Sequence, residues 1–318
     1  MQSIDQEDIH IVNKYSNLSE PEVNKLLHSH VYHNRNAWIK FLNLALLSLG
    51  IGFLVAGITF FFAYNWDDLP KFAKLGLTEL LLIATTVIAL MPRFQTQTRN
   101  VVLTGAAMLV GVLFAVFGQI YQTGANAYDF FLAWTLFVIL WVVISNFAPL
   151  WLLFLTLINT TFILYTQQVA KDWDEIFIIT VLFVFNSLSL IIAITIPEIS
   201  KNQGMPKWFL YTIALAAAGF ATVGNSIGIV NEFKSSFSIL IMITAGLYTL
   251  AVKHGVTTKN IFYPAIIAFS LIIILSVWLV DISEGAGMML LVSIYYIISI
   301  SIVIKILLFL KKKWSHDE

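Results

Sequence analysis

Apolar residues fill the chain in ten long stretches, which short polar segments separate. Each stretch is roughly twenty residues long, about the length that an α-helix needs to cross the hydrocarbon core of a bilayer. Only helices and closed barrels satisfy their backbone polar groups in that environment. The pattern therefore predicts an all-α, polytopic integral membrane protein with about ten transmembrane helices.

The predicted spans divide the chain into three parts. We expect residues 1–38 to form an N-terminal juxtamembrane segment, residues 39–310 a ten-helix transmembrane domain, and residues 311–318 a basic tail. The uncharged connection at 146–149 is either a loop or a kink. The spans are predicted at Ile39–Tyr64, Phe72–Met91, Val101–Ile120, Phe130–Phe147, Leu150–Thr166, Ile176–Pro197, Trp208–Ile229, Phe237–Val252, Ile261–Val280 and Met288–Leu310.

Basic residues favour one side of the predicted membrane. Of the 18 lysines and arginines, all but Lys71, Lys74, Lys171 and Lys234 fall in the segments on the same side as the N-terminus. Segments rich in lysine and arginine are retained in the cytoplasm. We therefore expect both termini to be cytoplasmic.

Composition agrees with a membrane protein. Hydrophobic residues make up 59% of the chain and charged residues 11%, against roughly 45–50% and 25% in soluble domains. The formal net charge is zero, so no overall field points to nucleic acid. The chain has no cysteine, which excludes disulfides and thiolate metal sites. We expect the bilayer as its surroundings, no cofactor and no metal; the oligomeric state stays open.

The histidines before the first span could in principle hold a metal, as His28, His30 and His33 lie close together in sequence. Structural zinc sites usually need four ligands and commonly include thiolates. A solvated helix is the better interpretation, and Ser19 with Glu22 fits a capping box that would begin it.

Glycine and asparagine repeat between the first and third spans. Gly50, Gly57 and Asn65 recur with the same spacing as Gly111, Gly118 and Asn126. One interpretation is a duplicated two-helix unit. The other is coincidence, because closely packed membrane helices are rich in small residues at such intervals.

Three stretches carry a family resemblance: Leu18–Glu22, the run Gly50–Leu69 with Phe62–Asp67 at its end, and Gly118–Asp129 followed by Trp134. Together they resemble the bacterial predicted membrane proteins grouped as domain of unknown function 2157, over roughly residues 15–150. The resemblance implies a bacterial inner-membrane protein. It brings no assigned activity and no catalytic residue.

Glu79 is the one charged residue well inside a predicted span. A charged side chain at the centre of a bilayer costs about 2.5–3.5 kcal/mol on insertion scales, so it normally faces a partner or a cavity. We expect Glu79 in the protein interior near the third span. It would be either a proton or cation site, or a protonated carboxyl that hydrogen-bonds a neighbouring helix.

Amide side chains gather at the outer end of the third span. Gln119, Gln122 and Asn126 would share one face if the helix continued past Ile120. With Asn65, Asp67 and Asp129 they predict a polar binding pocket that faces outward. The alternative is a polar cap where the bilayer ends. Single amides further along, Asn159, Asn186 and Asn225, fit interhelical hydrogen bonds.

Three functions are compatible with these residues. The first is a transporter or channel-like protein for a small solute or ion, with Glu79 and the Gln119 face as its polar pathway. The second is a non-transporting accessory, sensor or assembly protein, in which polar residues only pack helices. The third is an intramembrane enzyme that acts on a lipid-linked substrate through the outer acids.

The orientation can be tested with reporter fusions. A periplasm-active reporter placed after Leu310 should be silent, because the basic segments keep both termini in the cytoplasm. Activity of that reporter, or external labelling of a cysteine placed at Lys201 or Lys259, would reverse the predicted topology.

Overall fold

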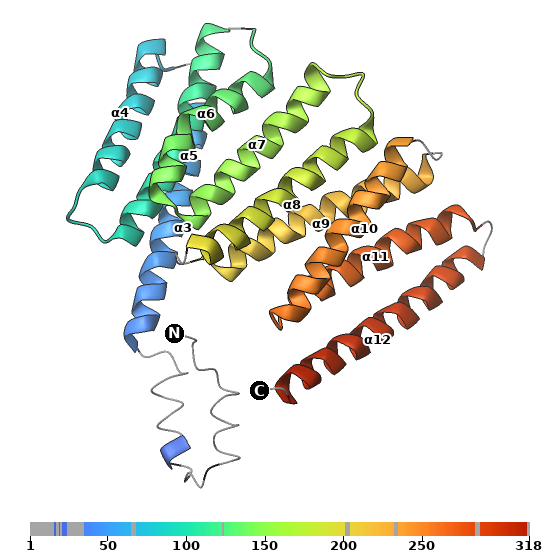
Figure 1. Cartoon of the computed structure of the whole chain (residues 1–318). Helices are drawn as coiled ribbons and strands as arrows, with labels where there is room; N and C mark the ends of the chain where they lie inside the picture. Colours follow the sequence, from blue (N-terminus) through green and yellow to red (C-terminus); the bar gives the residue numbers. More distant parts are fainter. Residues whose placement is uncertain are drawn as a thin grey trace. The chain divides into compact units, whose positions relative to one another are not determined.

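The computed structural model describes residues 16, 19, 21–23, 35–64, 68–122, 124–200, 204–231, 235–283 and 287–316. Within these ranges it has 10 helices that are long and apolar enough to cross a membrane, and it shows no strand. The all-α polytopic class is therefore confirmed. Figure 1 labels these helices along the chain. They fall into two compact units.

Unit 1 contains α3 (Arg35–Tyr64), α4 (Lys71–Leu90), α5 (Thr96–Tyr121) and the second half of α6 (Ala127–Ser145). Helix α5 lies at its centre and packs against α3 and α4. Small residues on α5, Gly105, Ala106, Ala107 and Gly111, are buried. Such residues let membrane helices approach closely, and the Ile51 side chain of α3 fills the space beside Gly105.

The turn between α4 and α5 is held by a side chain. Arg99 Nε donates a hydrogen bond of 2.9 Å to the backbone oxygen of Ala89. The last carbonyls of a helix have no partner within the helix, and a basic side chain there satisfies one of them.

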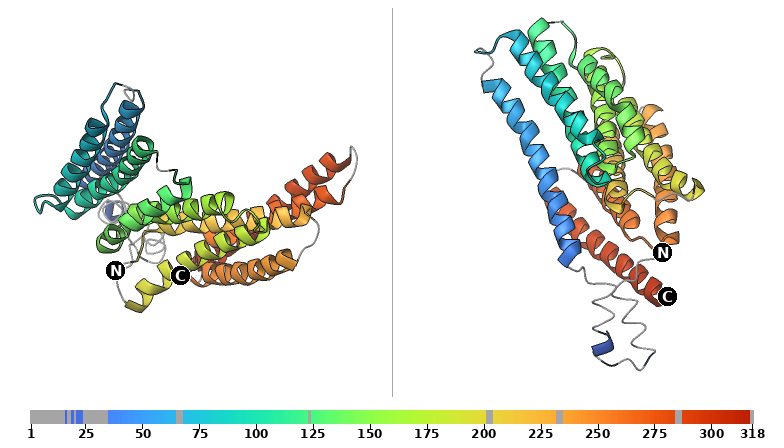
Figure 2. Two further views of the ribbon diagram at one scale, coloured as in Figure 1. Left: turned by 90° about the horizontal axis from the view of Figure 1, so that it is seen from above. Right: turned by 90° about the vertical axis from the view of Figure 1, so that its left-hand side faces the viewer.

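Unit 2 contains the first half of α6 and six complete helices, of which α8 and α9 lie side by side (Figure 2). Helix α9 also packs against α10 and α11, and α12 packs against α11. The six are α7 (Ala148–Gln168), α8 (Glu175–Ser200), α9 (Lys207–Val230), α10 (Ser235–Thr257), α11 (Phe262–Asp281) and α12 (Gly287–His316).

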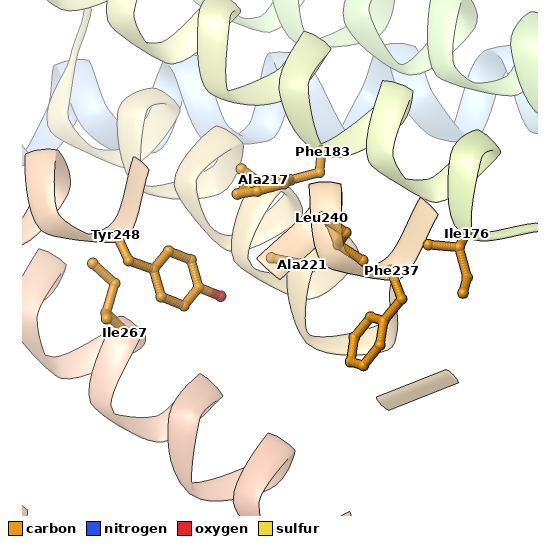
Figure 3. Close-up of a cluster of buried hydrophobic side chains, with 8 residues drawn as sticks. All are labelled: Ile176, Phe183, Ala217, Ala221, Phe237, Leu240, Tyr248 and Ile267. Carbon is orange, nitrogen blue, oxygen red and sulfur yellow. The ribbon is translucent and has the colours of Figure 1, made fainter. Parts of the chain in front are cut away.

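The core of unit 2 joins α9 to three neighbouring helices, α8, α10 and α11 (Figure 3). Helix α9 contributes the small residues Ala217 and Ala221, against which Phe183 of α8 and Leu240 of α10 pack. The remaining members are Ile176, Phe237, Tyr248 and Ile267. Small residues on one helix thus receive large ones from its neighbours, as tight packing in a membrane requires.

Two local features predicted from the sequence, the Ser19–Glu22 contact and the connection at 146–149, lie within the described residues. Ser19 donates from its backbone N–H (2.8 Å) and its hydroxyl (2.7 Å) to the Glu22 carboxylate. The Glu22 half of the predicted capping box is therefore confirmed, whereas the Glu22 N–H donates to the Ser19 carbonyl and not to its hydroxyl. The Ser19 backbone N–H and then its hydroxyl hold the pKa of Glu22 below its usual value.

The backbone at 146–147 is not helical, and Asn146 has a left-handed φ of 43°, so α6 and α7 are separate helices.

The glycine repeat does not correspond to equivalent packing. Gly50 and Gly57 are exposed on α3, whereas Gly111 is buried on α5. Asn65, the end of the first set, lies outside the described residues. The shared spacing therefore marks no common helix contact.

Gly228 provides a test of the α9–α10 packing. A Cβ at this position would overlap the buried ring of Phe237, whereas a Cβ at Gly219 on the same helix would meet nothing within 4 Å. Overpacking a buried site costs about 1–3 kcal/mol. We expect Gly228→Ala to lower the free energy of unfolding, measured by SDS titration in mixed micelles, by that amount. Gly219→Ala is the control, and equal effects of the two substitutions would disprove this packing.

Candidate functional site

Glu79 does not lie where the sequence predicted. Its side chain is exposed on α4, while Lys74 and Thr78 of the same helix are buried. In the part of the chain that the structure describes, Glu79 has no hydrogen-bond or ion-pair partner. The expectation of an interior Glu79 is therefore wrong. The physical reason is helical geometry: about 100° per residue turns Glu79 away from the face that packs on α5.

The amide row of the third span is interrupted. Helix α5 ends at Tyr121, and Gln122 adopts a left-handed conformation with φ 43°. Gly124 follows with φ 65°, so the helix does not continue to Asn126 and the three amides do not share one helical face. Gln119 and Gln122 are both exposed. A left-handed residue directly after a helix is a common way to end it.

Asn126 and Asp129 form the start of the next helix. The Asn126 N–H donates 3.0 Å to the Asp129 carboxylate, and the Asp129 N–H donates 3.1 Å to the Asn126 carbonyl. The first contact is the carboxylate half of a capping box, and the second is an ordinary backbone turn. Asp129 thus stabilises a helix terminus, while Asn65 and Asp67 lie outside the described residues.

Amides in unit 2 pair across helices. Asn159 of α7 and Asn186 of α8 exchange two side-chain hydrogen bonds, of 3.2 and 2.8 Å. Asn225 of α9 donates 3.0 Å to the hydroxyl of Thr244 on α10. All three amides also donate to a carbonyl four residues earlier in their own helix. These contacts have the geometry of interhelical hydrogen bonds that hold helices together.

Hydroxyl groups link α9, α10 and α11 in a short chain. The Ser270 hydroxyl lies 2.6 Å from that of Tyr248 and 2.6 Å from that of Thr222. Thr222 donates to the Ala218 carbonyl at 2.6 Å. Since each hydroxyl has a single proton, the consistent arrangement is that Tyr248 donates to Ser270 and Ser270 to Thr222. The Tyr248 oxygen therefore keeps acceptor capacity.

A cavity of about 270 Å³ lies among α8, α9, α10 and α11, next to Tyr248. Its wall on α9 consists of Ala214, Ala217 and Ala218, whose small side chains leave the space open. Polar groups are few and include Ser187, Tyr248 and His254. A mainly apolar cavity with a few polar groups is typical of a small-molecule site.

A second cavity of about 630 Å³ adjoins the first, since Ile194, His254 and Tyr263 line both. It lies where α8 ends, α9 begins, α10 ends, α11 begins and α12 ends. Its lining includes Lys207, Lys259, Lys311, Tyr211, Asn260 and Trp314. Tyr211 and Asn260 hold this end together, because the Asn260 amide donates 3.0 Å to the Tyr211 hydroxyl.

The two cavities were not predicted from the sequence. Its lysines indicated only membrane orientation, and His254 and Tyr248 are single polar residues without a motif. The available signal was the cluster of alanines at 214–218, since small residues on one helix face mark close packing or a space. Among the described residues, no group of three His, Cys, Asp or Glu side chains could hold a metal ion.

Comparison with known proteins supports the family resemblance. Residues 16–151 match the family model described as "Predicted membrane protein (DUF2157)", which confirms the similarity seen over roughly residues 15–150. No curated protein and no solved structure matches the chain. All the residues that line either cavity lie beyond the matched stretch. The chain is thus a predicted membrane protein with many apolar helices, and the match assigns no role to the cavities.

The Asn159–Asn186 pair can be tested by a double-mutant cycle. Interhelical hydrogen bonds in membranes contribute about 0.6 kcal/mol on average. We expect Asn159→Leu and Asn186→Leu together to destabilise the protein less than the sum of the single changes, by about that coupling energy. Asn159→Leu with Asn225→Leu is the control pair, because these amides share no bond. Additive effects for both pairs would contradict the assigned contact.

Proposed function

We propose that this protein moves a small solute across the bacterial inner membrane, and that the solute binds in the cavity among α8, α9, α10 and α11. The observation that carries the proposal is the pair of adjoining cavities. The mainly apolar cavity lies between spanning helices, and the wider one continues it to the end of the same helices. Sites between the helices of a bundle are a common location for small ligands.

The wider cavity opens, in this proposal, to the cytoplasm. Its lysines belong to segments that the charge distribution assigns to the cytoplasmic side, along with both termini. A solute would thus reach the site from inside the cell in the conformation described.

Toward their other ends the same helices are closely packed. Along α9, the cavity-lining residues end at Ala218, and Ala221, Gly224 and Gly228 follow as buried residues. Side chains of α8 and α10 fill the space beside Gly224 and Gly228. Passage to the opposite side therefore requires α8 or α10 to move against α9, as in the alternating access of membrane carriers.

Transport can be tested by filling the cavity. In proteoliposomes we expect uptake of a member of a panel of organic anions, cations and neutral solutes, led by octanesulfonate, which stays ionised. Ala217→Trp should reduce that uptake at least about tenfold, because the indole would occupy the space beside α9 where small ligands bind.

Leu215→Trp is the matched control, because Leu215 is on the same helix but exposed. It should leave uptake near the wild-type value. No uptake of any panel member by folded wild-type protein, or equal loss with both substitutions, would refute transport by this route.

A non-transporting accessory role is the second candidate, and the paired amides favour it. Asn159, Asn186 and Asn225 are hydrogen-bonded within the protein, as expected of residues that only pack helices. If this role is correct, Ala217→Trp should lower thermal stability or partner recovery, with no uptake to lose.

A further inference from the structure

The adjoining cavities differ in chemistry along their length. The cavity beside α9 is lined mainly by apolar side chains, among them Phe183, Leu190 and Ile267. The wider cavity carries three lysines from three separate parts of the chain: Lys207 begins α9, Lys259 follows α10, and Lys311 lies near the end of α12. A ligand that fills both must therefore be apolar at one end and polar at the other.

The charge of the wider cavity indicates which polar group a ligand would carry. Its described lining contains three lysines and His254 and includes no aspartate or glutamate. Lysines that line a shared space attract an anionic group, as clustered lysines attract anionic lipid at a membrane surface. The Asn260 amide has a second N–H, besides the one donated to Tyr211, that can donate to a carboxylate or phosphate.

Lys259 occupies a backbone position that favours glycine. Its φ is 51°, and the Asn260 N–H donates 2.7 Å to the Gly255 carbonyl, as in a helix C-terminal cap. Residues with a Cβ are disfavoured in this conformation. Glycine would adopt this backbone conformation more easily. The lysine found here instead brings a positive charge to the cavity.

The apolar cavity also reaches the side of unit 2. Ile191 of α8 and Leu250 of α10 both line it, and both are exposed. Exposed apolar side chains on spanning helices face lipid. An alkyl chain could therefore enter from the hydrocarbon region between these two helices. A volume of about 270 Å³ lies near the lower limit of small-molecule sites, which suits one chain better than two.

We propose that the adjoining cavities form one site for a single-chain anionic amphiphile, whose carboxylate or phosphate head lies among Lys207, Lys259 and Lys311 and whose alkyl chain lies against Ala214, Ala217 and Ala218. The inference rests on the proposed function, because it names the class of solute that the same cavity takes. A carboxylate and a phosphate are both compact anions, and the proposal depends on that shared property.

Native mass spectrometry of the detergent-solubilised protein tests the site with ligands that share one twelve-carbon chain. Dodecyl phosphate and laurate are the anionic probes, and dodecylphosphocholine is the zwitterionic probe. We expect one dodecyl phosphate or laurate to bind at least about tenfold more tightly than dodecylphosphocholine, since three lysines face the head. The stronger of the two anionic probes identifies the head as phosphate or carboxylate.

Replacing the three cavity lysines by glutamine should abolish this preference. The matched control is Lys253→Gln, Lys305→Gln and Lys313→Gln, which removes the same charge from exposed lysines outside the described lining. Lys259→Gly separates binding from folding, because glycine relieves the left-handed backbone. It should keep or raise thermal stability and still weaken the anionic probes.

Equal binding of the zwitterionic probe, or equal effects of the cavity and control lysine sets, would overturn the proposal. Uptake of octanesulfonate without preferential binding of anionic amphiphiles would refute this inference and leave transport in place. Preferential binding without uptake would support the site and refute transport.

Discussion

The interior of a bilayer offers no water to polar groups, and this constraint governs how every helix of the chain is built. Backbone groups are satisfied by the helices themselves. Threonine and serine hydroxyls follow the same rule, since Thr104, Thr161 and Ser189 each donate to a carbonyl four residues earlier. Where a side chain cannot be satisfied within its own helix, a neighbouring helix supplies the partner, as Asn186 supplies one for Asn159.

The same constraint explains why unit 2 has both a tight core and a cavity. Helices without a hydrophobic drive to associate depend on close packing of small residues. Beyond Ala221, Gly224 and Gly228 of α9 receive side chains of its neighbours. Around Ala214 and Ala218, the large residues of α8 and α10 leave a cavity open. One helix thus supplies both a packed half and an open half, and the open half adjoins the lysines.

The length and composition of the apolar stretches predicted the ten spans, because the bilayer imposes both on each helix separately. The contact of the Glu22 carboxylate with the Ser19 N–H was likewise predicted correctly, since it depends on residues three apart. Properties that depend on which helices are neighbours were not predicted. Glu79 sits in an apolar span, yet its direction depends on the face that α5 covers. The cavity combines residues of α8, α9, α10 and α11, and the sequence does not contain their packing order.

Cysteine accessibility can show whether a cavity penetrates the helices of unit 2 from the lysine-bearing end and stops at Ala218, before the closely packed part of α9. The chain has no cysteine of its own, so single substitutions report without background. Ala214→Cys lines the cavity, and Ala221→Cys lies in the core on the same helix. The measurement is the labelling rate with an anionic, membrane-impermeant thiol reagent. We expect the cysteine at 214 to react and the cysteine at 221 to stay unlabelled. Failure of the cysteine at 214 to react in folded protein, or equal rates at the two positions, would contradict it.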